Sequence, residues 1–310
     1  MQTLLIPLPG YEAMANEIAQ KLGQSAAGAY SAVERFPDGE TYHRLPDVRG
    51  QHVILVGGTV DDARLLELLD TASAAVMYGA QKLTMVVPYF GYSTMERAIK
   101  DGEVVKAKTR ARLLSAIPRS PLGNEIHLVD LHAEGLVHYF ENGTFARHIY
   151  AKQVICDGIR SYAQSSPIIL GSVDAGRAKW VQSLAQDLNA PAAFALKQRI
   201  SATETKLVAL SQSGFDPAAI VFIYDDMIRT GGSLLKAAQA YAAAGAKRIV
   251  AIATHGVLPG SSLQWIQDSG LIERVLVTDS HPRASELARS SPYLVILPLA
   301  TTLASHLHPS

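Results

Sequence analysis

The sequence predicts an α/β fold in which central, mostly parallel sheets are flanked by helices. Short apolar runs rich in β-branched residues alternate along the chain with longer Ala- and Leu-rich amphipathic segments. The apolar runs are continuous, as is typical of strands buried on both faces of a sheet. The chain has 310 residues, 48% of them hydrophobic, which is enough for two domains with cores of ordinary size.

The expected elements follow one another in a regular order. We expect strands at 52–58, 82–90, 126–132, 166–174, 218–226, 248–256 and 274–280. Segments with helical periodicity lie between them, including 61–79, 176–188 and 232–246. No Pro- or Ser-rich linker separates the two series of elements. We therefore expect two adjoining α/β domains, 1–150 and 151–310.

Charge and cysteine content narrow the classes of function. The 28 basic and 28 acidic residues balance, which argues against a general nucleic-acid binder. Cys156 is the only cysteine, so an intrachain disulfide and a Cys-rich zinc site are excluded, and a reducing cytoplasm fits. The N-terminus lacks the basic region of a signal peptide. Because no stretch approaches ~18 uninterrupted apolar residues, we expect no membrane span.

The strongest functional signal is the turn VFIYDDMIRTGGS at 221–233. Asp225 and Asp226 end an apolar run, and a short polar loop then leads into a predicted helix: Thr230, Gly231, Gly232 and Ser233. Glycines let backbone N–H groups close around a phosphate, and a helix N-terminus adds positive charge. The carboxylates would repel a phosphate, so they suit sugar hydroxyls or hydrated Mg²⁺. The turn predicts a ribose 5-phosphate pocket; the alternative is an ordinary capped helix.

This turn resembles the phosphoribosyl-pyrophosphate (PRPP) binding motif shared by type I phosphoribosyltransferases and ribose-phosphate pyrophosphokinases (PRPP synthetases). Other segments resemble the pyrophosphokinases in that family's order: RFPDGETYHR (35–44), VVPYFGYS (86–93), VDLHA (129–133), GSVDAGRAKW (171–180) and ATHGVL (253–258). The resemblance covers about residues 35–281. It implies two phosphoribosyltransferase-like domains and transfer of the β,γ-diphosphoryl group of ATP to the 1-hydroxyl of ribose 5-phosphate. It also implies Mg²⁺ and a homo-oligomer of dimers, usually hexameric.

The resemblance assigns roles to residues in five positions. Lys197 and Arg199 match the family's mobile catalytic pair, and two cations at i and i+2 of an extended segment could meet the charge on the transferred group. His132 matches the ligand of the Mg²⁺ that accompanies ATP, with Asp130 as its support. Asp174 matches an acidic residue linked to the metal or the ribose, although a helix N-cap is an alternative.

The expected ATP side keeps part of the family pattern. Phe36, Asp38 and Glu40 match an adenine loop that reaches the neighbouring subunit's site, although a surface Pro-Asp-Gly turn would have the same sequence. The family typically has an arginine, a glutamine and an aspartate where Thr94, Met95 and Glu96 stand. The run should still line the nucleotide side, with Arg97 or Lys100 replacing the lost charge.

Arg229 is a second departure, because many family members have an aspartate there. A guanidinium in the phosphate loop suits an additional anionic group on the acceptor; the alternative is that Arg229 points to solvent and the loop backbone binds the phosphate. Three alternatives to ribose-phosphate diphosphokinase activity stay open at this point. These are a diphosphokinase for another ribosyl 5-phosphoryl acceptor such as ADP-ribose, a weakly active regulatory paralogue, and a phosphoribosyltransferase that uses only the second domain.

Overall fold

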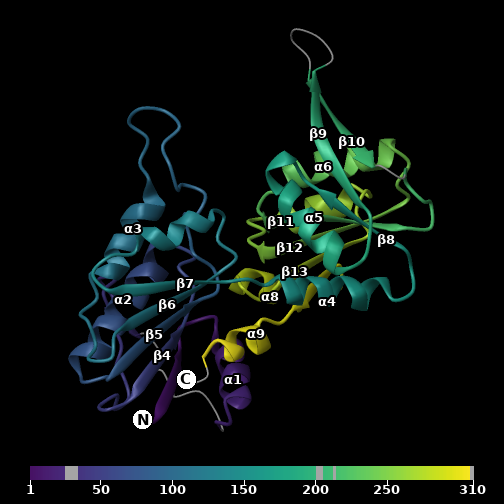
Figure 1. The fold of residues 1–310 in the computed structure, drawn as a ribbon. Helices are drawn as coiled ribbons and strands as arrows, with labels where there is room; N and C mark the ends of the chain where they lie inside the picture. Colours follow the sequence, from purple (N-terminus) through teal and green to yellow (C-terminus); the bar gives the residue numbers. More distant parts are fainter. Residues whose placement is uncertain (25–33, 200–204, 212–213, 308–310) are drawn as a thin grey trace. The chain divides into compact units, whose positions relative to one another are not determined.

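A computed structural model describes residues 1–24, 34–199, 205–211 and 214–307, with side chains described outside 196–213. Contacts divide the chain into two compact units (Figure 1). The first comprises Met1–Tyr150 and Leu299–Ser310, and the second comprises Ala151–Pro298. The C-terminal residues, which the sequence analysis placed in the second domain, thus belong to the first unit.

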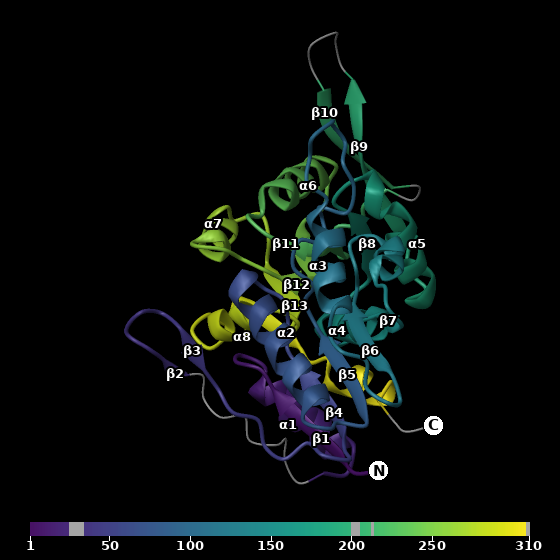
Figure 2. The same cartoon turned by 90° about the vertical axis from the view of Figure 1, so that its left-hand side faces the viewer.

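The first unit is built on a five-stranded parallel sheet of order β1-β4-β5-β6-β7. Its strands are β1 (Thr3–Pro7), β4 (His52–Val56), β5 (Lys82–Val87), β6 (Asn124–Val129) and β7 (Thr144–Ile149). A separate two-stranded antiparallel hairpin consists of β2 (Glu34–Arg35) and β3 (Thr41–Tyr42). Figure 2 shows this hairpin extending away from the parallel sheet of its unit.

The helices of the first unit are α1 (Glu12–Lys21), α2 (Asp62–Met77), α3 (Lys106–Ser115), the 3-10 helix η1 (Glu134–Tyr139) and α9 (Ala300–Ser305). Apolar side chains of α2 and α3 pack with those of β4, β5 and β6 in one core cluster. Helix α9 packs against α1, which places the end of the chain beside its beginning (Figure 1).

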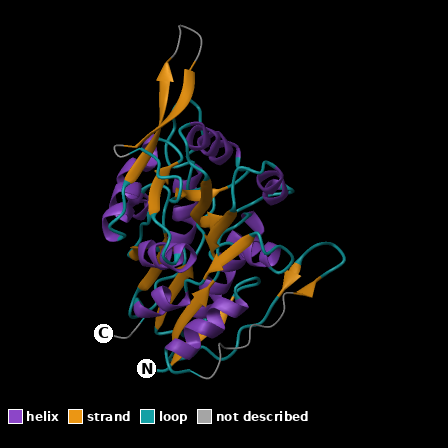
Figure 3. Ribbon diagram, turned by 90° about the vertical axis from the view of Figure 1, so that its right-hand side faces the viewer, coloured by secondary structure: helices purple, strands orange, loops and turns teal. Residues whose placement is uncertain are grey.

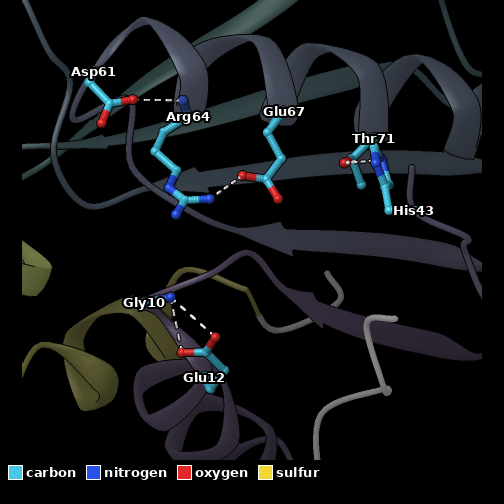
Figure 4. A network of polar contacts seen from close by, with 7 residues as sticks. All are labelled: Gly10, Glu12, His43, Asp61, Arg64, Glu67 and Thr71. Atoms are coloured by element: carbon cyan, nitrogen blue, oxygen red, sulfur yellow. Dashed lines mark hydrogen bonds and ion pairs between the residues drawn. The ribbon is translucent and has the colours of Figure 1, made fainter. Parts of the chain in front are cut away.

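Polar side chains fix two helix starts in this unit, as the close view in Figure 4 shows. Asp61 Oδ1 accepts a hydrogen bond from the Arg64 backbone N–H at 2.8 Å and so caps α2. The Arg64 guanidinium then pairs with Glu67 one turn later. At the start of α1, the Glu12 carboxylate accepts from the Gly10 backbone N–H.

The second unit contains a seven-stranded sheet of order β10-β9-β8-β11-β12-β13-β14. Its strands are β8 (Ile168–Ser172), β9 (Ala192–Arg199), β10 (Thr205–Ser211), β11 (Ile220–Ile228), β12 (Arg248–Gly256), β13 (Arg274–Thr278) and β14 (Leu294–Leu297). All neighbouring pairs are parallel except β9 and β10, which form an antiparallel pair at one edge (Figure 3).

Helices cover both faces of this sheet. They are α4 (Lys152–Ala163), the 3-10 helix η2 (Ala175–Arg177), α5 (Ala178–Asp187), α6 (Gly232–Ala243), α7 (Ser262–Asp268) and α8 (Pro282–Ala288). Side chains of α4 and α5 pack with one face in a cluster that includes Cys156 and Phe222. Side chains of α6, α7 and α8 pack with the other face. The strands between are therefore buried on both sides, as their continuous apolar sequences predict.

The α/β class with parallel sheets flanked by helices is confirmed. The expected strand 82–90 ends at Val87, just before Pro88, which has no N–H to donate to a ladder. Strand β11 instead continues through both aspartates to Ile228. The antiparallel β9–β10 pair departs from the otherwise parallel pattern. Among the described residues, no helix is sufficiently long and apolar to cross a membrane.

Candidate functional site

The turn after β11 joins the middle of the second unit's sheet to α6. Asp225 and Asp226 lie within β11, which β8 and β12 flank on its two sides. Arg229, Thr230 and Ser233 are exposed, Gly232 is half-buried and Gly231 is buried. The first-turn N–H groups of α6 lack intrahelical acceptors, as in every α-helix. Hydroxyls, backbone donors and a helix N-terminus are therefore available within one short loop.

Gly231 has two independent reasons to be a glycine. Its φ of 86° lies in the left-handed region, which a side chain disfavours. A Cβ added there would lie 2.6 Å from Cγ1 of Ile266, a fully buried residue of α7. The loop backbone therefore packs directly on α7, and this contact fixes the position at which α6 begins.

The two aspartates share one guanidinium. Arg177, the last residue of η2, places Nε 3.3 Å from Asp225 Oδ1 and Nη2 2.8 Å from Asp226 Oδ1. The side chains of Arg177 and Asp226 are 14% and 6% exposed. Burial, and next the negative charge of Asp226, raise the pKa of Asp225 above its ordinary range. Arg177 acts in the opposite direction on the pKa of Asp225 because it favours the ionised carboxylate.

Asp174 fixes the turn that carries Arg177. Its Oδ1 accepts from the Gly176 backbone N–H at 2.8 Å, which makes Asp174 the N-cap of η2. This contact matches the helix-cap alternative for Asp174. A metal or ribose role stays a prediction, and Asp174 is exposed at the carboxyl end of β8.

Lys197 and Arg199 both lie in β9, where they pair across the antiparallel ladder with Leu207 and Thr205. Their backbone is thus extended, as the i, i+2 argument assumes. Their side chains lie outside the described part of the chain, so the catalytic assignment stays a prediction.

The expected nucleotide side follows β5 in the first unit. Tyr92, with a φ of 63°, lies beneath two cations: Lys106 Nζ and Arg110 Cζ are 4.8 and 4.9 Å from its ring centroid. Arg110 also pairs with Asp62 at 2.8 Å, and its Nε has no hydrogen-bond partner in the described part of the chain. Positive charge therefore gathers at Tyr92 from helix α3.

The residues expected to bind ATP follow Tyr92 in the loop after β5. Thr94 and Glu96 are half-buried and Met95 is 39% exposed. Arg97 pairs with Glu96 at 3.2 Å, and its side chain is 75% exposed. Lys100 is exposed as well. Neither Arg97 nor Lys100 contributes to the cation pair on Tyr92.

The predicted adenine loop is the turn of the β2–β3 hairpin. Phe36, Asp38 and Glu40 are exposed, and 47% of Phe36 is accessible. Asp38 Oδ1 accepts from the Glu40 backbone N–H, and the Phe36 N–H donates to the Glu40 carbonyl. The turn thus presents an accessible aromatic ring, although its geometry also fits a simple surface turn.

Asp130 and His132 follow the end of β6 at Val129. Asp130 is buried and has a φ of 35°, so the chain leaves the extended conformation at this residue. The alternation of side chains along a strand therefore does not reach His132 and does not by itself place the two side chains on the same side. The metal roles themselves stay predictions. Within the described residues, no three His, Cys, Asp or Glu side chains group into a metal-binding cluster.

Comparison with known proteins identifies the family. Residues 4–117 match the model for the N-terminal domain of ribose phosphate pyrophosphokinase, and residues 200–300 match the phosphoribosyl synthetase-associated domain. A ribose-phosphate pyrophosphokinase of Prochlorococcus marinus (strain MIT 9313) is 32% identical over 296 residues, 94% of this chain and 85% of that protein. The chain belongs to the ribose-phosphate pyrophosphokinase family.

A second relative agrees with this assignment, and a solved structure shares the fold. The ribose-phosphate pyrophosphokinase of Parasynechococcus marenigrum (strain WH8102) is 33% identical over 297 residues, 94% of this chain and 85% of that protein. The crystal structure of phosphoribosylpyrophosphate synthetase from Mycobacterium smegmatis aligns with a TM-score of 0.84 over 99% of this chain and 97% of that one. At 24% identity, this likeness shows a shared fold.

Sequence reasoning missed three cations near the candidate site residues. Arg177 lies inside the segment 171–180, but only the acidic residue of that segment drew attention. Lys106 and Arg110 are spaced i, i+4, which places both on one face of a helix. That spacing is visible in the sequence, whereas the contact with Tyr92 depends on the return of α3 toward the end of β5.

Proposed function

We propose that this chain transfers the β,γ-diphosphoryl group of ATP to the 1-hydroxyl of ribose 5-phosphate, giving PRPP and AMP. The hydroxyl oxygen bonds to the β-phosphorus while the bond from that phosphorus to the oxygen bridging the α-phosphorus breaks. AMP leaves with the bridging oxygen, and the hydroxyl proton is released. Membership of the family supports this proposal, since its named relatives are ribose-phosphate pyrophosphokinases.

The loop between β11 and α6 is the observation that carries the sugar-phosphate assignment. The 5-phosphate would accept hydrogen bonds from Thr230, Ser233 and the backbone around the glycines, at the N-terminus of α6. Asp225 and Asp226 would accept hydrogen bonds from ribose hydroxyls, because a carboxylate does not repel a neutral hydroxyl donor. Arg229 would stand at the exposed rim of the same loop.

The ATP-binding residues are proposed in the first unit. Phe36 would stack on the base, with Asp38 and Glu40 accepting from its exocyclic amine. The stretch 94–97 would line the nucleotide. Lys106 and Arg110, which lie over Tyr92, supply positive charge suited to a triphosphate. They offer a replacement for the arginine that the family typically carries at the position of Thr94.

We expect Mg²⁺ to be coordinated mainly by the phosphates of the substrate. The described residues do not form a three-ligand cluster, and Mg²⁺ usually binds through one or two carboxylates together with substrate phosphates and water. His132, Asp130 and Asp174 are the proposed protein contributors. When bound, the ion would neutralise charge on the diphosphoryl oxygens. Lys197 and Arg199 would stabilise the same charge as it moves between oxygens. We also propose a homo-oligomer of dimers, such as a hexamer, in the cytoplasm.

The experiment that tests this function is AMP release from Mg·ATP with three acceptor conditions. Ribose 5-phosphate should give AMP, whereas ATP alone should give none. ADP-ribose in place of ribose 5-phosphate tests the altered-acceptor alternative that Arg229 suggested. AMP that forms with ADP-ribose but not with ribose 5-phosphate would contradict the proposal. No AMP with either acceptor, together with binding to an active synthetase, would indicate the regulatory paralogue.

A further inference from the structure

Arg177 joins two neighbouring strand ends in the second unit. It sits in the turn after β8, while Asp225 and Asp226 lie in β11, the parallel neighbour of β8. One guanidinium meets both carboxylates, at 3.3 Å through Nε and at 2.8 Å through Nη2. All three side chains are less than one-quarter exposed. This arrangement is more enclosed than a surface ion pair, so solvent screens it less.

Electrostatics give Arg177 a definite task. Two adjacent carboxylates at a partly buried strand end repel each other, and removal from water disfavours both charges. A guanidinium can offset this with directional hydrogen bonds, and its planar fork also restricts where the accepting oxygens lie. The orientation of the acidic pair therefore depends on the turn that carries Arg177.

That turn is itself held in place. The carboxylate of Asp174 accepts from the Gly176 backbone N–H at 2.8 Å, so the chain enters η2 in one fixed conformation. Arg177 contacts the Oδ1 atom of each aspartate, and Asp225 Oδ1 also accepts a hydrogen bond from the Asp226 backbone N–H. A carboxylate accepts about four hydrogen bonds. Arg177 occupies only part of this accepting capacity, so its contact with the pair does not by itself exclude sugar hydroxyls.

We propose that Arg177 is a positioning residue for sugar recognition: it holds Asp225 and Asp226 in the orientation that reads the ribose hydroxyls. This inference rests on the proposed function, since it assigns the carboxylates to the sugar. In this role Arg177 would act through the aspartates rather than on the reacting phosphorus. Loss of Arg177 should therefore weaken the binding of the sugar phosphate and leave the binding of ATP unchanged.

The test compares Arg177→Gln and Arg177→Lys with the wild type. Lys179→Gln is the matched control, because it removes one exposed positive charge two residues further along. Calorimetry measures the affinity for ribose 5-phosphate and for 2-deoxyribose 5-phosphate, which lacks one hydroxyl. Steady-state kinetics measures the KM for ribose 5-phosphate and for ATP, and thermal unfolding reports whether each variant is folded.

Arg177→Gln should lower the affinity for ribose 5-phosphate on the order of 10- to 100-fold, which is the loss expected for hydrogen bonds between charged groups. The affinity for 2-deoxyribose 5-phosphate should fall less, so the preference for ribose 5-phosphate over the 2-deoxy sugar should decrease. Arg177→Lys, which lacks the fork, should recover part of the loss. The KM for ATP should stay unchanged, and Lys179→Gln should behave as the wild type.

Two results would overturn the inference. Unchanged or tighter ribose 5-phosphate binding by folded Arg177→Gln would mean that Arg177 is dispensable or obstructs the sugar. An equal loss for both sugars would mean that it does not act through hydroxyl recognition. Failure of the proposed function is distinguishable, because the wild type itself would then release no AMP with ribose 5-phosphate.

Discussion

Replacing Gly231 by alanine tests the loop geometry most sharply. The φ of 86° would cost an alanine about 1–2 kcal/mol. The new Cβ would lie 2.6 Å from Ile266 Cγ1, well inside the 3.5–4.0 Å optimum for carbon atoms. Overpacking of this kind costs about 1–3 kcal/mol. Together, Gly231→Ala should lower the free energy of unfolding by about 2–5 kcal/mol, which corresponds to a melting temperature roughly 4–20 °C lower.

Two comparisons separate the backbone cost from the steric one, each followed by scanning calorimetry. Gly270→Ala, at a φ of 65° with no atom within 4 Å of the added Cβ, should show the backbone cost alone. Ile266→Val removes Cδ1, which lies 2.8 Å from the added Cβ, and should recover part of the loss when combined with Gly231→Ala. The reasoning is refuted if Gly231→Ala is as mild as Gly270→Ala, or if Ile266→Val adds its own full cost.

Three further predictions concern other parts of the chain. Burial lowers the pKa of His52 to about 4, so the folded state favours the neutral ring. The free energy of unfolding that depends on this ring is complete above pH 6.5 and is lost as the pH falls toward 4. This loss of about 3 kcal/mol should give denaturant unfolding a steeper acid dependence than in His52→Gln. Arg110→Gln should raise the KM for ATP about tenfold, and Arg112→Gln, on the exposed side of α3, should not. Lys197→Ala should lower kcat by orders of magnitude with little loss of ribose 5-phosphate binding; equal losses would contradict a transition-state role.

The sequence predicted the α/β architecture because buried parallel strands are continuous apolar runs and their crossovers are amphipathic helices. It also located the loop 225–233, since a phosphate cradle next to a helix needs glycines and hydroxyls that are contiguous in the chain. The C-terminal helix was placed in the wrong unit because its packing on α1 joins the two ends of the sequence. Local patterns carry no information about such a contact.

Contacts between distant segments account for the features that the sequence analysis missed at the site. The sequence separates Arg177 from Asp225 by a helix and two strands, and only the pairing of β8 with β11 brings them together. Arg97 and Lys100 were favoured as replacement charges because they are close to Thr94 in the chain. The cations that contact Tyr92 belong instead to α3, which packs near the carboxyl end of β5.

AMP release is the measurement that tests the central claim most directly. Purified protein is incubated with Mg·ATP in the presence and absence of ribose 5-phosphate, with Lys197→Ala as the control for contaminating enzymes. The account predicts AMP and a pentose bearing a diphosphate at carbon 1, in equal amounts, only when ribose 5-phosphate is present and the wild-type protein is used. No acceptor-dependent AMP from folded wild-type protein would contradict it.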